Sequence, residues 1–365
     1  MNILIFLVIL LVLVIVHEFG HFYSAKKFGI RVDEFGFGFP PKLFGKKFGE
    51  TEYTFNLFPL GGFVKIFGEN PDEENTNGPD KHRSFVNKPK WQQAIVLFAG
   101  VFANFVLAWF LFSFGFMSGL PTSVGSNIAG DNLKDINLVV ISVTPESPAM
   151  SAGLKSGDKI VFIKNDQGQS TTYISAATVK SIVVSSKEIE IGYLRGKNPD
   201  INYTNITPSL RGGDGEPFIG ISMDQIGIAK LPILSAFKEG MKLTLFVSKN
   251  TAVGLYRLIV DGLQAKGSFS AVTGPVGMVG IVGDAYQFGF VYLLSFTALI
   301  SINLAIINLA PFPALDGGRL LFLLIEKIKG SRLNPKFANT VNVIGFCALL
   351  LLMGIVTYHD IVKLF

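Results

Sequence analysis

Residues 1–27, MNILIFLVILLVLVIVHEFGHFYSAKK, decide the fold of this chain. Residues 3–23 form an apolar run long enough to span ~30 Å of hydrocarbon, yet the run contains His17, Glu18 and His21. An ionisable side chain near the middle of a bilayer costs about 2.5–3.5 kcal/mol unless a partner offsets that cost. A membrane helix that carries these groups so close together therefore indicates that they have a function.

The composition is that of a membrane protein. Of the 365 residues, 49% are hydrophobic and 16% are charged, well below the ~25% of charged residues in soluble domains. The net charge of +5 comes from basic residues that flank the apolar runs, so nucleic acid is not expected as a partner. A cleaved signal peptide is the alternative for the first run, but its basic pair Lys26-Lys27 follows the apolar core instead of preceding it.

Four runs are long enough to cross a bilayer: 3–23, 93–119, 288–310 and 339–358. Lys and Arg gather in 24–90 and in 311–338, whereas 119–130 and 267–287 contain neither residue. Since basic residues stay on the cytoplasmic side, both chain termini and the long segment between the second and third runs are expected outside.

That external segment contains a soluble domain. Residues 136–166, INLVVISVTPESPAMSAGLKSGDKIVFIKND, alternate as a strand, form a short helix after Pro148 and turn at Gly157-Asp158 into a second strand. The S-P-A-x-x-A-G-L-x-x-G-D-x-I pattern of 147–160 resembles the PDZ domains of bacterial proteases; an unrelated small β domain is the alternative. The amphipathic segment that follows suits helices lying on the outer membrane surface.

The cytoplasmic segment 29–90 is rich in Phe, Gly and Pro. Its two apolar strands are joined by a basic turn with Lys42, Lys46 and Lys47, which predicts a β-hairpin. Because its aromatic faces suit water poorly, we expect the hairpin to dip into the inner leaflet, where protein must cover its backbone.

The expected fold class is a polytopic α-helical membrane protein with four transmembrane helices, a membrane-associated β-hairpin and an inserted α+β PDZ domain. Its expected parts are the first transmembrane helix (1–28), the hairpin region (29–90), the second helix (91–119), the PDZ domain (120–230), interfacial helices with a Gly-rich segment (231–287), the third helix (288–318), a cytoplasmic loop (319–338) and the fourth helix with the tail (339–365).

The three ionisable groups of the first run match a metal motif. His17 and His21 are four residues apart and so share one face of a helix, with Glu18 beside that face. This H-E-x-x-H pattern supplies two imidazole ligands for Zn²⁺ and a carboxylate that acts as general base. A catalytic zinc ion needs a third protein ligand. His82 lies in a polar linker and His359 at the outer end of the fourth run, so neither is expected to reach the metal. We therefore expect Asp316, just past the cytoplasmic end of the third run, with a capping Asp as the alternative.

Six motifs together resemble the site-2 protease family of intramembrane zinc metalloproteases, in its bacterial RseP-type branch, here with a single PDZ domain. They are HEFGH at 17–21, GETEY at 49–53, PLGGFVK at 59–65, the PDZ pattern, TGPVG at 273–277 and NLAPFPALDGG at 308–318. The chain departs from the family where Val101 follows Gly100 in place of a proline, and where relatives carry two PDZ domains.

The resemblance implies peptide-bond hydrolysis in or beside the transmembrane helix of membrane proteins with a single span, such as anti-sigma factors or signal-peptide remnants, in the bacterial inner membrane. The active site then lies toward the cytoplasmic leaflet. Asn308 matches a family position that contacts the substrate or the tetrahedral oxyanion, and an interhelical hydrogen bond is its alternative role. For Asn104 and Asn303 such an interhelical bond is expected. The ligand of the PDZ domain stays open.

A substrate helix must unwind before hydrolysis, and the released backbone groups need new partners. We expect the 51–58 strand to offer them an edge, with Phe55, Asn56 and Leu57 as substrate-binding residues. Two other functions fit buried ionisable residues. A catalytically silent scaffold would have lost a ligand, and a metal or ion transporter needs polar groups across both leaflets, where spans two to four offer only scattered Asn, Ser and Thr.

Overall fold

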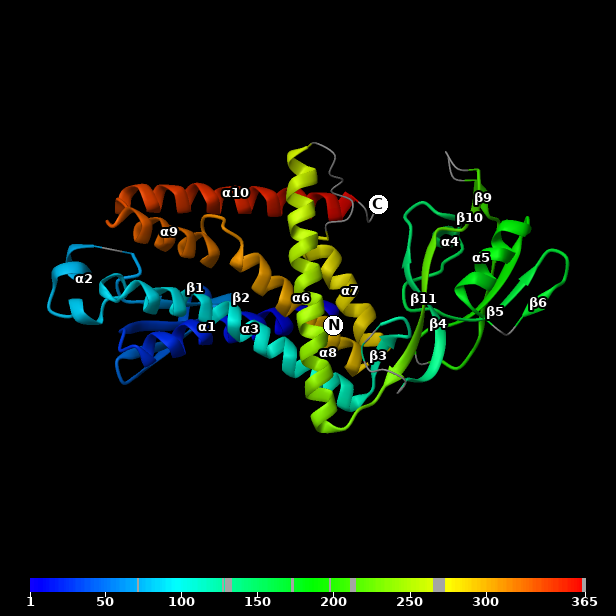
Figure 1. Cartoon of the computed structure of the whole chain (residues 1–365), viewed down its shortest axis with the longest axis horizontal. Helices are drawn as coiled ribbons and strands as arrows, with labels where there is room; N and C mark the ends of the chain where they lie inside the picture. The colour runs from blue at the N-terminus through cyan, green and yellow to red at the C-terminus, as the bar shows by residue number, and fades with distance from the viewer. Residues whose placement is uncertain are drawn as a thin grey trace. The chain divides into compact units, whose positions relative to one another are not determined.

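The structure of the chain is a computed structural model that describes all residues except 71, 127, 129–132, 172–173, 197, 211–214, 265–272 and 363–365. Figure 1 shows its elements. The helices are α1 (Asn2–Lys27), α2 (Glu73–Asn77), α3 (Lys90–Ser118), α4 (Pro148–Ser151), α5 (Ala176–Ser185), α6 (Ile233–Leu263), α7 (Pro275–Phe288), α8 (Phe290–Leu309), α9 (Asp316–Lys329) and α10 (Pro335–Val362). The strands are β1 (Val32–Phe48), β2 (Thr51–Ile66), β3 (Leu120–Ser123), β4 (Leu133–Val143), β5 (Lys159–Asn165), β6 (Ser170–Thr171), β7 (Ile189–Leu194), β8 (Asn202–Ile206), β9 (Ser209–Leu210), β10 (Pro217–Phe218) and β11 (Ile221–Ala229).

The four predicted spans are confirmed as helices α1, α3, α8 and α10. They have 26, 29, 20 and 28 residues and are apolar enough to cross a membrane. At 1.5 Å per residue, about 20 residues are enough for ~30 Å of hydrocarbon. The chain is therefore a multi-pass membrane protein.

The chain divides into two compact units. The membrane unit comprises Met1–Leu111, Leu243–Gly283 and Phe296–Phe365, and the sheet unit comprises Phe112–Lys242 and Asp284–Ser295.

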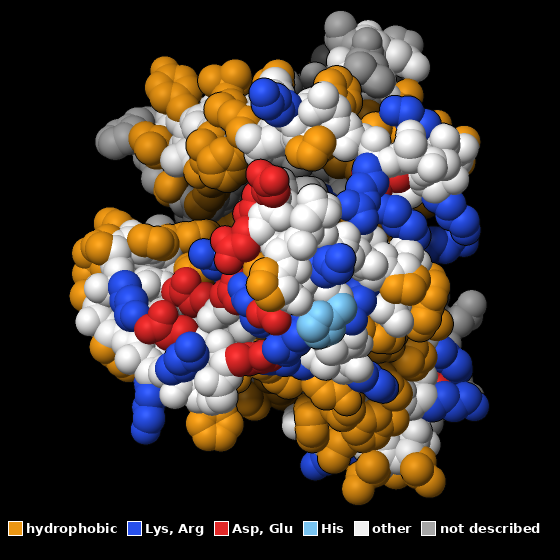
Figure 2. Space-filling view, turned by 90° about the vertical axis from the view of Figure 1, so that its left-hand side faces the viewer, with side chains coloured by type: hydrophobic (Ala, Val, Ile, Leu, Met, Phe, Trp, Pro, Cys, Tyr) orange, Lys and Arg blue, Asp and Glu red, His pale blue; other side chains and the backbone are white. Residues whose placement is uncertain are grey.

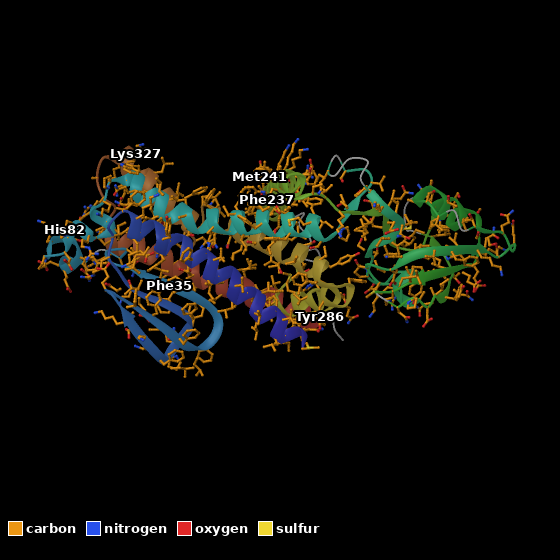
Figure 3. The ribbon with its side chains drawn as sticks, turned by 90° about the horizontal axis from the view of Figure 1, so that it is seen from below. Phe35, His82, Phe237, Met241, Tyr286 and Lys327 are labelled. Carbon is orange, nitrogen blue, oxygen red and sulfur yellow. The ribbon has the colours of Figure 1, made fainter. Side chains whose placement is uncertain are left out.

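Glycines bring α1 and α3 close together in the membrane unit, where the two helices run side by side in Figures 1 and 3. A Cβ atom on Gly20 would lie 2.3 Å from the carbonyl oxygen of Ala99 and 2.9 Å from the Cα atom of Gly100. Only glycine at position 20 therefore allows this approach of the two backbones.

Both strands of the hairpin after α1 bend back, so each strand contributes two segments to the sheet. Residues 34–37 of β1 pair with 62–65 on one side and with 52–55 on the other, and 52–55 also pair with 44–47. The spatial order is therefore 42–48, 51–56, 32–39 and 62–66, with 42–48 and 62–66 at the edges. The prediction that the 51–58 stretch forms an edge is wrong for Phe55, whose backbone has Phe37 and Phe44 as partners on its two sides.

Aromatic packing holds this sheet against α1. Phe35, labelled in Figure 3, packs edge-on against Phe22 of α1 with ring centroids 5.4 Å apart. Phe55 stacks on Phe37 and on Phe44, at 4.7 and 4.8 Å between centroids. Other rings of the sheet are exposed, among them Phe48 at 78%, which leaves an aromatic surface on the hairpin.

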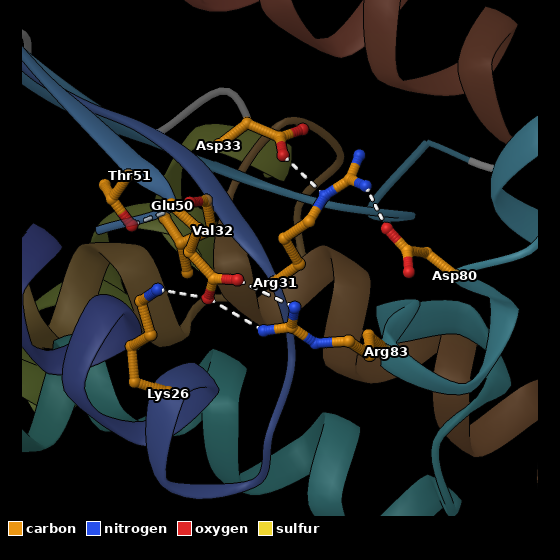
Figure 4. Close-up of polar contacts among 8 residues, drawn as sticks. All are labelled: Lys26, Arg31, Val32, Asp33, Glu50, Thr51, Asp80 and Arg83. Carbon is orange, nitrogen blue, oxygen red and sulfur yellow. Dashed lines mark hydrogen bonds and ion pairs between the residues drawn. The ribbon is translucent and has the colours of Figure 1, made fainter. Parts of the chain in front are cut away.

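Ion pairs tie the base of the hairpin to the end of α1, as Figure 4 shows. Glu50 accepts hydrogen bonds from Arg83 at 2.8 Å and from Lys26 at 2.5 Å, and Arg31 bridges to Asp80 at 2.6 Å. The hydrogen bonds from Arg83 and then from Lys26 lower the pKa of Glu50 to about 2. Figure 2 shows that charged side chains gather in the middle of this face, with hydrophobic ones above and to the left of them and below them.

The sheet unit is built on a seven-stranded sheet with the strand order β3-β11-β4-β5-β7-β8, in which β6 pairs with β5. Residues of the 147–160 pattern stabilise this unit. Ser147 caps α4 through the amide of Met150 at 3.3 Å. Asp158 is fully buried, and Arg195 donates to both of its carboxylate oxygens at 2.7 Å. The assignment of this unit as a PDZ domain stays a prediction.

The expected third span, 288–310, agrees with α8, which ends at Leu309. The 319–338 stretch, expected to be a loop, differs from the structure, because most of a separate helix, α9, lies there. Part of the Gly-rich segment predicted within 231–287, residues 265–272, lies outside the described residues, as does the end of the tail.

Candidate active site

His17 and His21 lie on one face of α1, as their spacing predicts. They are only 7% and 6% exposed, and their Nε2 atoms are 3.3 Å apart. The Nδ1 atom of His21 lies 2.8 Å from the carbonyl oxygen of Val96 on α3. A carbonyl only accepts, so Nδ1 carries the proton and Nε2 keeps its lone pair.

Asp316 begins α9 and joins the two imidazoles. Its Oδ2 atom lies 3.1 Å from Nε2 of His17 and 3.2 Å from Nε2 of His21. This oxygen is buried and has no hydrogen-bond partner among the described residues. Two glycines allow the sharp path of the chain here, since a Cβ on Gly317 would lie 2.2 Å from the carbonyl oxygen of Leu309.

The three atoms fit a zinc ion. Bonds of about 2.0–2.1 Å from a tetrahedral zinc ion place neighbouring ligand atoms about 3.3–3.4 Å apart, close to the observed separations of 3.1, 3.2 and 3.3 Å. The lone pair on Nε2 of His21 and the buried Oδ2 atom of Asp316 face each other at 3.2 Å. A cation between them would offset their repulsion. Within the described part of the chain, His17, His21 and Asp316 are the group of residues able to hold a metal ion.

Asn104 of α3 makes the interhelical hydrogen bond expected for it, and its partner is His17 of α1. Its amide nitrogen lies 3.4 Å from Nδ1 of His17, while its Oδ1 is buried without a partner among the described residues. If His17 bound a metal ion through Nε2, its Nδ1 would carry a proton and would need an acceptor. A flip of the Asn104 amide supplies that acceptor and satisfies Oδ1, since the two amide orientations occupy the same space.

Glycine at position 100 leaves the space in which the imidazoles lie. A Cβ on Gly100 would be 2.3 Å from Nε2 and 2.6 Å from Cε1 of His21, and 2.9 Å from Cε1 of His17. In the sequence, Gly100 drew attention only because Val101 follows it in place of a proline. The spacing of four between Gly100 and Asn104 places both residues on one face of α3. This spacing could have indicated that Gly100 faces the histidines.

Glu18 is half-buried on α1 beside the ligand pair. The hairpin passes next to it, since a Cβ on Gly62 would lie 3.8 Å from Cγ of Glu18, and the carboxylate interacts with the backbone of Val64. The edge segment 62–66 therefore runs along the carboxylate predicted to be the general base.

The remaining predicted residues have different surroundings. Asn308 is half-buried in the last turn of α8, and its side chain makes no hydrogen bond within the described residues. Asn303 accepts a hydrogen bond from Thr251 of α6 at 3.2 Å, which confirms its interhelical role. Asn56 is buried and donates to the carbonyl of Gly38 at 3.1 Å, whereas Leu57 is 48% exposed.

Comparison with known proteins identifies the family. Residues 5–352 match the model of peptidase family M50. A putative zinc metalloprotease of Clostridium perfringens is 34% identical over 96% of this chain and 95% of its own length. The zinc metalloprotease RasP of Geobacillus kaustophilus is 30% identical over 100% of this chain and 98% of its own, and the regulator of sigma-W protease RasP of Bacillus subtilis is 29% identical over 99% and 98%. The chain belongs to peptidase family M50, the site-2 protease family, and is a zinc metalloprotease of the membrane.

Proposed function

We propose that His17, His21 and Asp316 hold the zinc ion of this protease and that Glu18 is its general base. The observation that carries this proposal is the convergence of two imidazole Nε2 atoms from the spanning helix α1 and one carboxylate oxygen from the start of α9, at separations of 3.1–3.3 Å. The complete donor set also argues against a catalytically silent scaffold.

The reaction is hydrolysis of a peptide bond. A bound zinc ion supplies Lewis acidity for water and for the substrate carbonyl. The Glu18 carboxylate removes one proton from the attacking water while the oxygen of that water bonds to the carbonyl carbon of the substrate. As the C–N bond breaks, Glu18 returns this proton to the leaving nitrogen, so that one water is consumed and Glu18 ends as a carboxylate. Asn308, half-buried eight residues before Asp316, is the proposed donor to the substrate carbonyl oxygen.

The substrate proposed is a membrane protein with one transmembrane helix. His17 lies ten residues before the end of α1 at Lys27, so its ring is within about 15 Å of that end at 1.5 Å per residue. This end carries the ion pairs of Figure 4, and His82 and Lys327 lie at the same end in Figure 3. Basic residues favour the cytoplasmic side, which supports an active site toward the cytoplasmic leaflet. The Bacillus subtilis relative is named a regulator of sigma-W protease, which supports membrane-bound regulators of sigma factors as substrates.

The unwound substrate is proposed to pair with the edge segment 62–66. Among the described residues, this segment has strand partners on one side only, at 32–37, and it passes Glu18. A strand added to an edge regains backbone hydrogen bonds that the bilayer cannot supply. The substrate-binding role of Phe55, Asn56 and Leu57 stays a prediction, now as side-chain contacts from an inner strand.

The sheet unit is proposed to be a PDZ domain that restricts access and does not take part in catalysis. A cavity of about 570 Å³ lies between α5 and residues 216–223, and among the described residues the 221–224 part of β11 pairs with β4 on one side. Such a groove beside a strand suits an extended peptide.

The experiment that tests the proposed function is Glu18→Gln in the purified full-length protein. The amide cannot accept the proton of water, so cleavage of a single-span substrate is expected to fall by 10²-fold or more. Zinc content is expected to stay at the wild-type value, because Glu18 is not a ligand. Loss of zinc together with activity would make Glu18 a ligand and refute the assignment.

A further inference from the structure

The turn that carries Asp316 is held in a strained conformation. Its residue Ala314 has a φ of +73°, in the left-handed region that a side chain with a Cβ atom disfavours. Backbone hydrogen bonds close the turn on either side, from Phe312 to the carbonyl of Ala310 at 2.7 Å and from Leu315 to that of Phe312 at 3.2 Å. A residue other than glycine keeps such a conformation only where its surroundings impose it.

Helix α10 supplies those surroundings. The backbone N–H of Ala314 donates to Oδ1 of Asn342 at 3.2 Å. Gly345 is three residues further along α10 and so lies on the same face. A Cβ on Gly345 would be 2.6 Å from Cβ of Pro313 and 2.8 Å from its carbonyl oxygen. The two residues of α10 therefore fix the turn by one hydrogen bond and one close backbone contact.

These contacts are a large part of what holds α10 in place, because α10 is the least buried of the four spans. Only 6% of its most apolar stretch is buried, against 22%, 39% and 33% for α1, α3 and α8. Near its other end, Asp360 accepts a hydrogen bond from the amide of Gly277 at 2.9 Å. The placement of α10 thus depends on contacts near its two ends, and one of these is the turn before Asp316.

The three proposed zinc ligands are consequently positioned by different helices. His17 and His21 are oriented by Asn104 and Val96 of α3, whereas Asp316 follows Ala314 by two residues. We propose that Asn342 and Gly345 are positioning residues for Asp316, so that α10 sets the affinity of the site for zinc. This inference rests on the proposed function of Asp316 as a ligand.

The test is the zinc affinity of the full-length protein in detergent, measured by competition with a chelator of known affinity. Asn342→Ala is expected to weaken zinc binding about tenfold, at the low end of the 10–100-fold effects of outer-shell partners. Adding Ala314→Gly to this variant is expected to restore most of the loss, because glycine adopts the positive φ without the hydrogen bond. At saturating zinc, kcat of Asn342→Ala is expected to fall while KM is unchanged.

Asn339→Ala is the matched control. Asn339 is an exposed residue one turn earlier on α10, and its variant should bind zinc as the wild type does. Wild-type affinity in Asn342→Ala would overturn the inference, as would an equal loss in Asn342→Ala, the double variant and Asn339→Ala, which would indicate general destabilisation. His17→Ala and Asp316→Ala must lose zinc in the same assay. If they retain it, the proposed function fails, and this result is distinct from a failure of the inference.

Discussion

Gly100→Ala perturbs the proposed ligand pair while leaving every ionisable group in place. The added Cβ would lie 2.3 Å from Nε2 and 2.6 Å from Cε1 of His21, whereas van der Waals contact needs about 3.5 Å. The imidazole must therefore move by about 1 Å, or α1 and α3 must separate by a similar distance. A displacement of about 1 Å in an active site can cost about 10²-fold in rate, and insertion of a methyl group into a packed core costs about 1–3 kcal/mol of stability.

Two assays separate these effects. Gly100→Ala is expected to bind zinc 10–100-fold more weakly and to cleave a single-span substrate about 10²-fold more slowly, while thermal unfolding in detergent shows that the protein stays folded. Gly354→Ala is the matched control, because Gly354 also lies in a spanning helix and a Cβ there meets nothing within 4 Å. Wild-type zinc affinity and cleavage in Gly100→Ala would refute the close contact between α3 and the imidazoles.

Three further predictions concern other parts of the chain. Because Arg83 and Lys26 lower the pKa of Glu50 to about 2, this carboxylate stabilises the fold above pH ~4.5, and its contribution is lost as the pH falls toward 2; melting temperatures of Glu50→Gln should therefore change less between pH 5 and 2.5 than those of the wild type, and parallel curves would contradict this. A photo-crosslinking residue at position 63 should capture a bound substrate helix in the Glu18→Gln background more strongly than one at position 55, and the reverse yield would exclude strand addition at the 62–66 edge. Asp158→Asn should destabilise the sheet unit by about 2–3 kcal/mol, seen as faster hydrogen exchange of β5 and β7 in the full-length protein, whereas unchanged exchange would show that the Arg195 contact is unimportant.

The helices and the proposed ligands could be predicted from the sequence because both depend on local patterns. Apolar length predicts a spanning helix, and the spacing of four between His17 and His21 places both on one face. Asp316 followed from the small set of remaining donors and from the Pro and Gly residues around it, and its Oδ2 lies within 3.2 Å of both imidazoles.

The residues that orient these ligands could not be predicted in the same way. Val96 and Asn104 reach His21 and His17 across 75 and 87 positions of the chain, and no local pattern encodes which faces of α1 and α3 meet. An interhelical bond was correctly expected for Asn104, but its partner His17 was not. Asn342 depends on a third helix, and its partner is a backbone amide that carries no signal in the sequence.

Two local errors had signals that were available. The 319–338 stretch was expected to be a loop, although α9 has Asp316 in its first turn, Lys327 and Lys329 in its last turn, and Gly330 with φ +74° at its C-terminal end, all of which favour a helix. The edge of the hairpin was misplaced because each strand was assumed to pair along one side only. The bends near 40 and 60 fold each strand back, so that Phe55 has strand partners on both sides.

The most direct measurement of the central claim is the zinc X-ray absorption spectrum of the full-length protein, compared with that of Asp316→Ala. Two imidazoles and a carboxylate predict a first shell of nitrogen and oxygen at about 2.0–2.1 Å, with scattering from two histidine rings, and the variant should lose oxygen ligation and bind zinc much more weakly. A spectrum with a sulfur ligand from Cys347, or one that is unchanged in Asp316→Ala, would contradict the account.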